Sequence, residues 1–481
     1  MTPPETERPG PPPLVLRHVE LAGAVVDVAI RDGRIEAIGE LPPAAADATV
    51  IDGHGGALLP GLHDHHVHLM ALGAALDSVD VGPPGVVDRR SLAATLRAAG
   101  AVMAPGVWLR AVGYHEDAAG PLDRWLIDAA VDDRPVRVQH RSGALWVLNS
   151  LALAEVGLPS TDAPPAGCEL AADGSPTGRL LRLDGWLAER IPRRPVDLAR
   201  VGRLLAARGV TGVTDATPFD SIDDLDLIVR AVSDGSLPQH VIVTGSPALD
   251  VASLPSPLVA GPAKLLLHDH DLPTPDALAE QIRSARTQGR AVAVHCVTRA
   301  SLVVTLVAFG DVGTVIGDRI EHGAVVPPEL YDDLRQLGLT VVTQPNLVAE
   351  RGDDYRRDVD PEDLAHLWPC RSLLDAGISV AAGTDAPFGR PDPWALVDAA
   401  TKRQAPSGAV VGPDERLGAA DALDLLLRPG ARPFDPARRV TVGQPADLCL
   451  LRTPLAEALA APADVSVRCT LIDGRRHDPS A

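Results

Sequence analysis

The pattern of hydrophobic and polar positions differs between the two ends of the chain and its middle. At both ends, short apolar runs border Asp-Gly pairs, Asp32-Gly33 and Asp473-Gly474, a pattern typical of β-hairpins. The strand-like runs at the ends are Val26–Ile30, Ile35–Ile38, Asp447–Leu451 and Val465–Ile472. Because both ends are β-rich, we expect 14–59 and 405–481 to form one small β-sandwich domain.

In the middle, across 60–404, apolar strand-like runs alternate with helical segments such as Asp276–Gln288 and Pro361–Ala376. The candidate strands are 58–68, 107–112, 136–139, 209–215, 240–244, 263–267, 291–295, 319–322, 340–343 and 379–382. This alternation predicts an α/β fold, a (β/α)₈ TIM barrel that forms the catalytic domain. The barrel has eight places for these ten candidates, so two of the four strands between 107 and 244 must lie outside it.

The composition is that of a water-soluble globular protein, with 46% hydrophobic and 22% charged residues among 481. The net charge of −20 argues against binding to nucleic acid or an anionic membrane, because both need clustered cations. No apolar run reaches the roughly 18 residues that a membrane span needs. The proline-rich residues 1–13 predict a disordered tail, and the odd number of cysteines, five, fits reduced thiols. We therefore expect a cytoplasmic location.

The strongest chemical signal is the segment Pro60-Gly-Leu-His-Asp-His-His-Val-His68, which follows an apolar run. Residues two apart on a strand share a face, so His66 and His68 can point at one metal ion while Asp64 orients a ligand. A histidine-rich loop that binds nothing is the competing interpretation. Four histidines within six residues, out of 15 in the chain, favour the metal site.

His295, His322 and Asp385 each stand at or just beyond the end of an apolar strand-like run. In a (β/α)₈ barrel, this carboxyl end of the strands is where active sites are built. A single residue in such a position is more often a buried structural group than a ligand. Because the position is shared, we expect these side chains to meet at one point. Nitrogen and oxygen ligands of this kind suit Zn²⁺ or a similar divalent ion.

Taken together, these motifs resemble the amidohydrolase superfamily of metal-dependent hydrolases. The matched positions are Pro60, Gly61, Asp64, His66 and His68 in the first-strand motif, then His295, His322 and Asp385. Glu321-His322-Gly323 and Gly383–Pro387 resemble more narrowly the subgroup called amidohydrolase family 3, or YtcJ-like. Asn149–Leu153 and Gly443–Asp447 extend the resemblance over nearly the whole chain.

The resemblance also implies a role for Lys264. The chain has only two lysines beside 42 arginines, and Lys264 lies in the apolar run 262–267. Superfamily members with a lysine on the fourth barrel strand carry it as a carbamate that bridges two metal ions. A neutral amine can react with carbon dioxide, whereas a guanidinium cannot. The implied cofactors are one or two divalent ions, with Zn²⁺ expected, and a carbamate on Lys264; a buried lysine paired with a carboxylate is the structural alternative.

At some positions this sequence has residues that differ from those usual in the subgroup. His268-Asp-His-Asp271 stands where an Asp-Gly pair is usual, and Ala144 follows Gly143 where histidine is frequent. We expect such positions to face the substrate. The candidate residues around the metal or the substrate are Asp64, His140, His268, His270 and Glu321. A small-molecule substrate is expected, and the resemblance alone makes a homodimer plausible.

The resemblance implies hydrolysis of a C–N bond other than a peptide bond, in an amide, an N-acyl or N-formyl compound, or a cyclic amide. A metal-activated water would attack the carbonyl, and Asp385 would act as general base and then as general acid. A deaminase with a single metal and a lactone or ester hydrolase stay open as alternatives. A non-catalytic relative should lack ligands, whereas every matched position is filled here.

Overall fold

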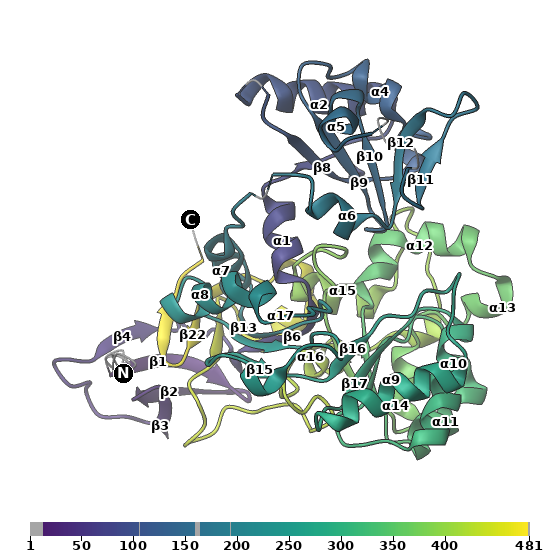
Figure 1. Cartoon of the computed structure of the whole chain (residues 1–481). Coiled ribbons are helices and arrows are strands. Elements are labelled where there is room, and N and C mark those ends of the chain that lie inside the picture. The colour runs from purple at the N-terminus through teal and green to yellow at the C-terminus, as the bar shows by residue number, and fades with distance from the viewer. Residues whose placement is uncertain (1–12, 105, 159–163, 193, 480–481) are drawn as a thin grey trace, which may run out of the picture. The chain divides into compact units, whose positions relative to one another are not determined.

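The computed structural model describes residues 13–104, 106–158, 164–192 and 194–479, which form two compact units (Figure 1). One unit comprises the chain up to Leu69 and from Leu198 onward, and the other comprises Met70–Asp197. The predicted tail, 1–13, lies outside the described residues except for Pro13. The sequence placed the segment of the second unit inside a continuous domain over 60–404, whereas it is compact by itself.

The first unit contains two sheets in which all strands are parallel, with the orders β15-β14-β13-β6 and β16-β17-β18-β19-β20. Their strands are β6 (Leu62–Val67), β13 (Val210–Asp215), β14 (His240–Val243), β15 (Val259–Ala260), β16 (Ala263–Leu265), β17 (Val292–Cys296), β18 (Arg319–His322), β19 (Thr340–Thr343) and β20 (Ser379–Ala382). Every residue of β6, β13, β18 and β19 is buried. Burial on both faces is typical of parallel sheets that are covered by helices.

Backbone hydrogen bonds connect the edges of these two sheets. At one edge, only Gly261 and Pro262 separate β15 from β16, and Lys264 N donates to Gly245 O at 2.7 Å. At the other edge, beyond the ends of β20 and β6, Asp385 N donates to His66 O at 2.8 Å, and His68 N donates to Ala386 O at 2.9 Å. Side chains at the ends of strands from both sheets are therefore brought close together.

Helices follow most of the parallel strands. The helices of the first unit include α7 (Leu198–Ala207), α8 (Asp226–Asp234), α9 (Pro275–Thr287), α10 (Arg299–Val312), α11 (Tyr331–Gln336), α12 (Asn346–Asp358), α13 (Pro361–Leu364), α14 (Cys370–Asp375), α15 (Pro393–Lys402), α16 (Ala419–Leu426) and α17 (Leu455–Ala460). The predicted helix over 361–376 is wrong as a single element, because it is interrupted between α13 and α14. Pro369 lacks an N–H and disfavours helical geometry in the preceding residue, Trp368, which has φ +49°. Among the described residues, no helix combines the length and apolar character that crossing a lipid bilayer requires.

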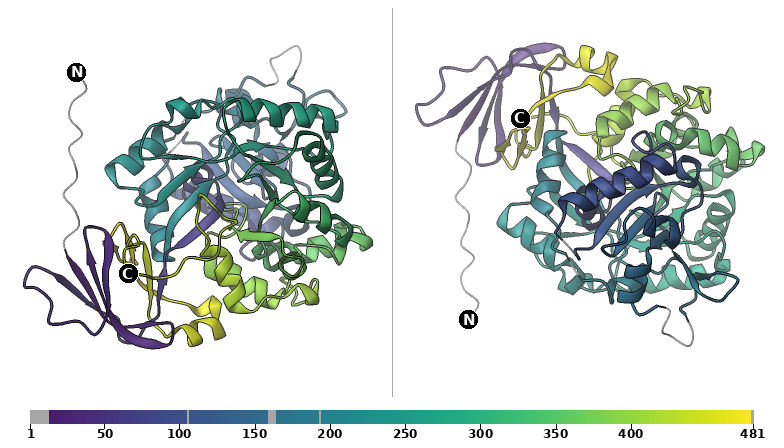
Figure 2. Two further views of the ribbon diagram at one scale, coloured as in Figure 1. Left: turned by 90° about the horizontal axis from the view of Figure 1, so that it is seen from below. Right: turned by 90° about the horizontal axis from the view of Figure 1, so that it is seen from above.

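Two four-stranded sheets are built from the chain ends, with the orders β3-β2-β1-β4 and β23-β22-β21-β5. Their strands are β1 (Leu14–Leu21), β2 (Ala24–Arg31), β3 (Arg34–Gly39), β4 (Thr49–Asp52), β5 (Leu58–Pro60), β21 (Leu448–Leu451), β22 (Val467–Ile472) and β23 (Arg475–His477). Side chains from both sheets share one hydrophobic cluster, and both views of Figure 2 show the purple and yellow strands side by side. The turn between β2 and β3 has positive φ at Asp32 and Gly33, as the predicted hairpin requires.

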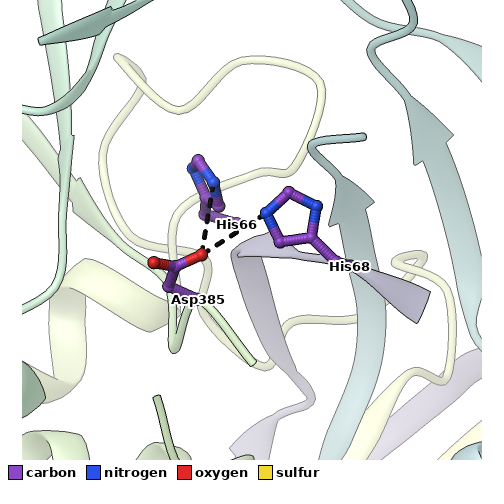
Figure 3. A group of neighbouring side chains, drawn as sticks. All are labelled: His66, His68 and Asp385. Carbon is purple, nitrogen blue, oxygen red and sulfur yellow. Dashed lines mark ion pairs between the residues drawn. The ribbon is translucent and has the colours of Figure 1, made fainter. Parts of the chain in front are cut away.

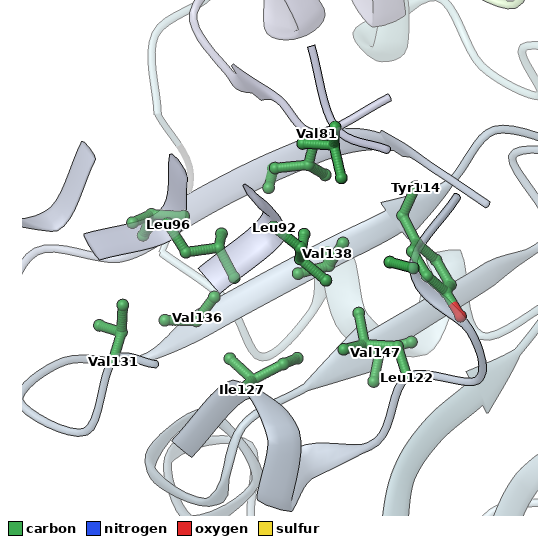
Figure 4. Packing of buried hydrophobic residues seen from close by; sticks show 14 of the residues in the cluster. Val81, Leu92, Leu96, Tyr114, Leu122, Ile127, Val131, Val136, Val138 and Val147 are labelled. Carbon is green, nitrogen blue, oxygen red and sulfur yellow. The ribbon is translucent and has the colours of Figure 1, made fainter. Parts of the chain in front are cut away.

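The second unit is built around a six-stranded sheet with the order β11-β12-β10-β9-β8-β7. Its elements are α1 (Leu69–Leu76, which begins in the first unit), β7 (Val79–Asp80), α2 (Arg89–Val102), β8 (Leu109–Tyr114), α3 (Glu116–Ala119), α4 (Arg124–Asp128), β9 (Val136–His140), β10 (Leu145–Leu148), α5 (Ser150–Glu155), β11 (Cys168–Leu170), β12 (Pro176–Leu181) and α6 (Asp184–Ala188). Leu92 and Leu96 of α2 pack against Val136 and Val138 of β9 in a core of its own (Figure 4). Two of the ten strand candidates, 107–112 and 136–139, correspond to β8 and β9 of this sheet and not to strands of the two parallel sheets.

Candidate active site

His66, His68 and Asp385 meet at the carboxyl ends of β6 and β20. The Nε2 atoms of His66 and His68 lie 3.6 and 3.4 Å from the same oxygen, Oδ1 of Asp385 (Figure 3). One possible ligand atom of each residue lies within 4.8 Å of the others, so the three could hold one metal ion. His66 is buried, and the side chain of His68 is 17% exposed, which leaves the group open on one side.

Two further histidines extend this group from neighbouring strands. The ring centroid of His322, at the end of β18, lies 4.7 Å from that of His66 and 4.4 Å from that of His295 on β17. Both His322 and Asp385 have positive φ, +72° and +56°, which residues other than glycine seldom adopt. Such backbone conformations concentrate at functional sites, where the surrounding structure holds them in place.

One ring nitrogen of each of three histidines is already engaged by a neighbouring side chain. Nδ1 of His68 lies 3.0 Å from Thr217 Oγ1, and Nδ1 of His322 lies 2.8 Å from Gln344 Oε1. Nδ1 of His66 is hydrogen-bonded to the Glu321 carboxylate. Such a contact fixes the orientation of the ring and leaves Nε2 as the nitrogen that can coordinate a metal ion. This is the usual arrangement of histidines that bind metals.

Lys264 is fully buried on β16, beside these histidines. Lys264 on β16 pairs with Ala293 on β17, and His295, two residues further along β17, pairs with Glu321 on β18. Because residues two apart on a strand share a face, the side chains of Lys264, His295 and Glu321 point to the same side of the sheet. Within the described part of the chain, Lys264 Nζ has no hydrogen-bond partner. Burial lowers the pKa of Lys264, against the opposing effect of the Glu321 charge. Its structural alternative, a direct pair with a carboxylate, is therefore not formed here.

Buried charges set the ionisation of the group. Burial raises the pKa of Glu321, but Arg319, whose Nε lies 2.5 Å from Oε1, and Lys264 hold that pKa well below its usual value. Burial also raises the pKa of Asp385, but the hydrogen bond with His68 and the neighbouring imidazoles of His66 and His322 outweigh burial, so the pKa is lowered. Burial lowers the pKa of His66 to about 3. The carboxylates are thus anionic and this imidazole neutral, the states in which such groups bind metals.

Asp64 acts on the backbone around the site. Its Oδ1 accepts hydrogen bonds from Thr384 N at 2.9 Å and His66 N at 3.2 Å, and Oδ2 accepts one from Thr384 Oγ1 at 2.5 Å. Burial raises the pKa of Asp64 to about 6. The neighbouring Gly383 has no room for a side chain, because a Cβ would lie 2.3 Å from His66 N. Asp64 therefore joins the segment that carries His66 to the segment that carries Asp385.

The alternation along β6 turns the remaining histidines of the motif away. The rings of His63 and His65 contact each other, with centroids 4.6 Å apart. His63 Nε2 lies 3.0 Å from Thr214 Oγ1. As expected for a strand, this pair lies on the opposite face from Asp64 and His66.

Three other predicted contact residues belong to other segments of the chain. His140 ends β9 in the second unit, where its Nε2 lies 3.0 Å from Glu116 Oε2. His268 and His270 are exposed in the segment that follows β16, with ring centroids 5.8 Å apart. Their suggested contact with substrate stays a prediction.

Sequence reasoning missed the side chains that position the histidines. Gln344 directly follows β19 and contacts His322, and Asp215 ends β13 and accepts a hydrogen bond from Thr217 N at 2.9 Å. The signal was the same one that identified His295, a polar residue at the end of an apolar run. Applied to 209–215 and 340–343, it would have found both residues.

Comparison with known proteins adds independent findings. The family model described as "Amidohydrolase family" matches residues 49–477. An N-substituted formamide deformylase from Arthrobacter pascens is 27% identical over 514 aligned residues, covering 93% of this chain and 94% of that protein. The protein YtcJ of Bacillus subtilis (strain 168) is 23% identical over 404 residues, with 73% of this chain and 74% of that protein covered.

A solved structure shares the fold. The crystal structure of an uncharacterized metal-dependent hydrolase from Pyrococcus horikoshii superposes with a TM-score of 0.73 at 20% sequence identity. The match covers 97% of this chain and 100% of that chain. The neighbour thus supports the α/β architecture over the full length.

Proposed function

Because the chain belongs to the amidohydrolase family, we propose that it hydrolyses a C–N bond, other than a peptide bond, in a small molecule. The observation that carries this proposal is the convergence of histidines, a lysine and an aspartate at the ends of parallel strands. The relative from Arthrobacter pascens is named for N-substituted formamides, which supports N-formyl or other N-acyl amines as the substrate class.

The two parallel sheets would form one closed (β/α)₈ barrel around this site. Counting β15 and β16 as one interrupted strand, the parallel strands number eight and follow one another in chain order. The backbone hydrogen bonds at both sheet edges support closure. The shared hydrophobic cluster of the terminal sheets supports a β-sandwich built from both chain ends.

The side chains present suit a divalent metal. His66, His68, His295, His322 and Asp385 would hold one or two ions, for which Zn²⁺ is our proposal because imidazole and carboxylate are its usual ligands outside thiolate sites. The structural basis is the set of Nε2 atoms left available by the Nδ1 contacts. When bound, the metal would polarise the substrate carbonyl and lower the pKa of a water molecule.

Lys264 would complete the site as a carbamate. Its unpartnered, buried amine favours the neutral form, which can add to carbon dioxide. A bond from Nζ to carbon then forms and one proton leaves, so the side chain gains a carboxylate-like group with two oxygens. That group would supply negative charge where Lys264 otherwise places an amine without a hydrogen-bond partner near His66, His295 and His322.

Asp385 would move the proton during hydrolysis. Its carboxylate is ionised and lies beside Nε2 of His66 and His68, so it can accept a proton from the attacking water. The same oxygen can then deliver the proton to the nitrogen that leaves. Asp64 and Glu321 would hold the segments and rings around it in place.

The experiment is a hydrolysis screen with metal-loaded protein and a series of N-substituted formamides, N-acetyl amines and cyclic amides. We expect release of formate or another acid with an amine, loss of activity after chelation, and recovery on adding Zn²⁺. His68→Ala should bind less metal, whereas His54→Ala, at an exposed position away from the site, should bind as the native chain does. Native protein that binds less than one ion per chain and hydrolyses none of the compounds would contradict the proposal.

A further inference from the structure

Two arginines lie side by side on one face of the six-stranded sheet in the second unit. In the parallel pairing of β8 with β9, Arg110 stands directly opposite Arg137 (Figure 1). The guanidinium carbons of these arginines lie 5.3 and 5.0 Å from the ring centroid of Trp146 on the next strand, β10. Like charges that stand opposite each other in a sheet destabilise it unless something compensates them.

The hydrogen-bond partners of Arg110 are neutral. Its Nη1 donates to Ala74 O at 2.8 Å and to Ser78 Oγ. Its Nη2 donates to Gln139 Oε1 at 3.1 Å. These contacts fix the orientation of the guanidinium, but none of the three acceptors carries a charge. The positive charge of Arg110 is therefore held in place without an ion pair among the described residues.

Arg137 lacks even neutral partners. Within the part of the chain that the structure describes, Arg137 Nε is buried without a hydrogen-bond partner, and no carboxylate forms an ion pair with this side chain. The one carboxylate that acts on its pKa, Asp184, is engaged by Trp146 Nε1 at 2.7 Å. Burial, with a smaller effect of the Arg194 charge, lowers the pKa of Arg137 to about 10, so the guanidinium stays charged at neutral pH. A partly buried charge without a partner is costly.

The kind of ligand that compensates this group follows from its charge and shape. The whole chain has a net charge of −20, so three neighbouring guanidinium groups are a local exception and not part of a generally basic surface. The flat, forked guanidinium binds the oxygens of a carboxylate or a phosphate through parallel N–H···O hydrogen bonds. The Arg137 side chain is partly exposed, so a small ion can reach it from solvent. A metal cation would be repelled at this place.

We propose that Arg110 and Arg137 bind a small oxyanion, a carboxylate or a phosphate, on this face of the sheet. Arg137 supplies N–H donors that have no other acceptor, and Arg110 supplies a second charge whose orientation is already fixed. A ligand that meets donors fixed in advance loses less free energy to ordering them. The proposal is independent of the hydrolytic activity, because neither arginine belongs to the candidate active site.

The first test is calorimetric titration of the full chain with sodium phosphate and, separately, with sodium acetate, at an ionic strength kept constant with sodium chloride. We expect the native chain to bind one of these anions, and the preferred anion identifies the ligand as a phosphate or a carboxylate. Arg137→Gln should bind it at least tenfold more weakly, and Arg137→Lys, which keeps the charge but lacks the fork, should lie between. The control Arg90→Gln, at an exposed position of α2, should bind as the native chain does. Binding of neither anion, or equal binding by the native chain and Arg137→Gln, would overturn the proposal.

The second test separates anion binding from a merely structural role of Arg137. A ligand that binds only the folded chain raises the melting temperature progressively with its concentration. We therefore expect the difference in melting temperature between the native chain and Arg137→Gln to widen as the anion concentration rises at constant ionic strength. If Arg137 served only to pack against Trp146, the variant would be destabilised by the same amount at every anion concentration, and the proposal would be refuted.

Discussion

At the residue scale, the candidate site depends on which groups are charged. Burial alone would favour neutral forms of every side chain in the group. The carboxylates of Asp385 and Glu321 nevertheless stay ionised, because cationic or hydrogen-bonding partners outweigh burial. The amine of Lys264 has no hydrogen-bond partner within the described residues, and burial lowers its pKa although the charges of Glu321 and Asp385 act in the opposite direction. The site thus combines anionic carboxylate oxygens with an amine that burial shifts toward its neutral form and a neutral imidazole.

Asp385→Asn tests the proton transfer. The amide keeps the size of the side chain but cannot accept the proton, so we expect kcat to fall roughly 100-fold or more. The melting temperature should change little, and metal content should be measured in parallel to separate loss of base from loss of ligand. Asp375→Asn, a change at a 66% exposed aspartate, serves as the control. Turnover near the native value would remove Asp385 from the mechanism.

Lys264→Arg tests the carbamate. A guanidinium cannot add to carbon dioxide and brings a permanent charge, so we expect the bound metal to fall by at least one ion per chain in elemental analysis. Lys402→Arg changes the only other lysine, which is 55% exposed, and should leave the metal content unchanged. Equal metal content and activity in both variants would show that Lys264 has only a structural role.

At the element scale, short signals set where helices begin and end. Thr274 caps α9 through a hydrogen bond from Ala277 N at 3.2 Å, and Asp88 caps α2 in the same way through Ser91 N. Gly377, which directly follows the predicted helical segment 361–376, has φ +75° just after α14. Helix ends can therefore be predicted from the sequence where a side chain caps the helix or a glycine adopts positive φ.

Gly377→Ala tests this stop. A Cβ at positive φ is strained, so we expect the free energy of unfolding to fall by about 1 kcal/mol. Space is not the cause, because a Cβ there would meet nothing within 4 Å. The matched change Gly185→Ala is equally open but lies within helix α6, where alanine should stabilise by about 0.5 kcal/mol. Chemical denaturation of both variants measures the difference, and equal effects would refute the explanation.

At the scale of the whole molecule, ion pairs connect segments that are distant in the sequence. His240, the first residue of β14, contacts Asp447 just before β21, with Nε2 and Oδ2 3.0 Å apart. The hydrogen bond with Asp447 raises the pKa of His240, with Asp473 acting in the same direction and burial and Arg438 against it. Burial raises the pKa of Asp447, but His240 outweighs burial and the pKa is lowered.

This pair predicts a pH dependence of stability. The contribution of His240 to the free energy of unfolding is fully present below its unfolded-state pKa of about 6.5. It is lost as the pH rises through the raised pKa of His240 in the folded state. The contribution of Asp447 is present above about pH 4 and is lost as the pH falls through its lowered value. His240→Gln should therefore lower the urea midpoint more at about pH 6 than at about pH 8.5. Asp447→Asn should have the same effect, and a loss that is equal at both values would contradict the prediction.

Much of the site and part of the fold could be predicted from local patterns. His66, His68, His295, His322 and Asp385 all end or follow apolar runs, and the structure brings them together. The family and the enzyme class, an amidohydrolase, are confirmed by the match over 49–477. The Asp32-Gly33 hairpin is confirmed as well, because its turn depends on neighbouring residues only.

The sequence by itself determined which residue types stand at strand ends, because strand periodicity and turn chemistry are local properties. Only the tertiary structure decided that 107–112 and 136–139 belong to a separate sheet, since an apolar run does not reveal its hydrogen-bonding partner. It also decided that Glu321, Thr217 and Gln344 hold the histidine rings. Such contacts join residues that are far apart in the chain, and their distances are set by the packing of whole sheets.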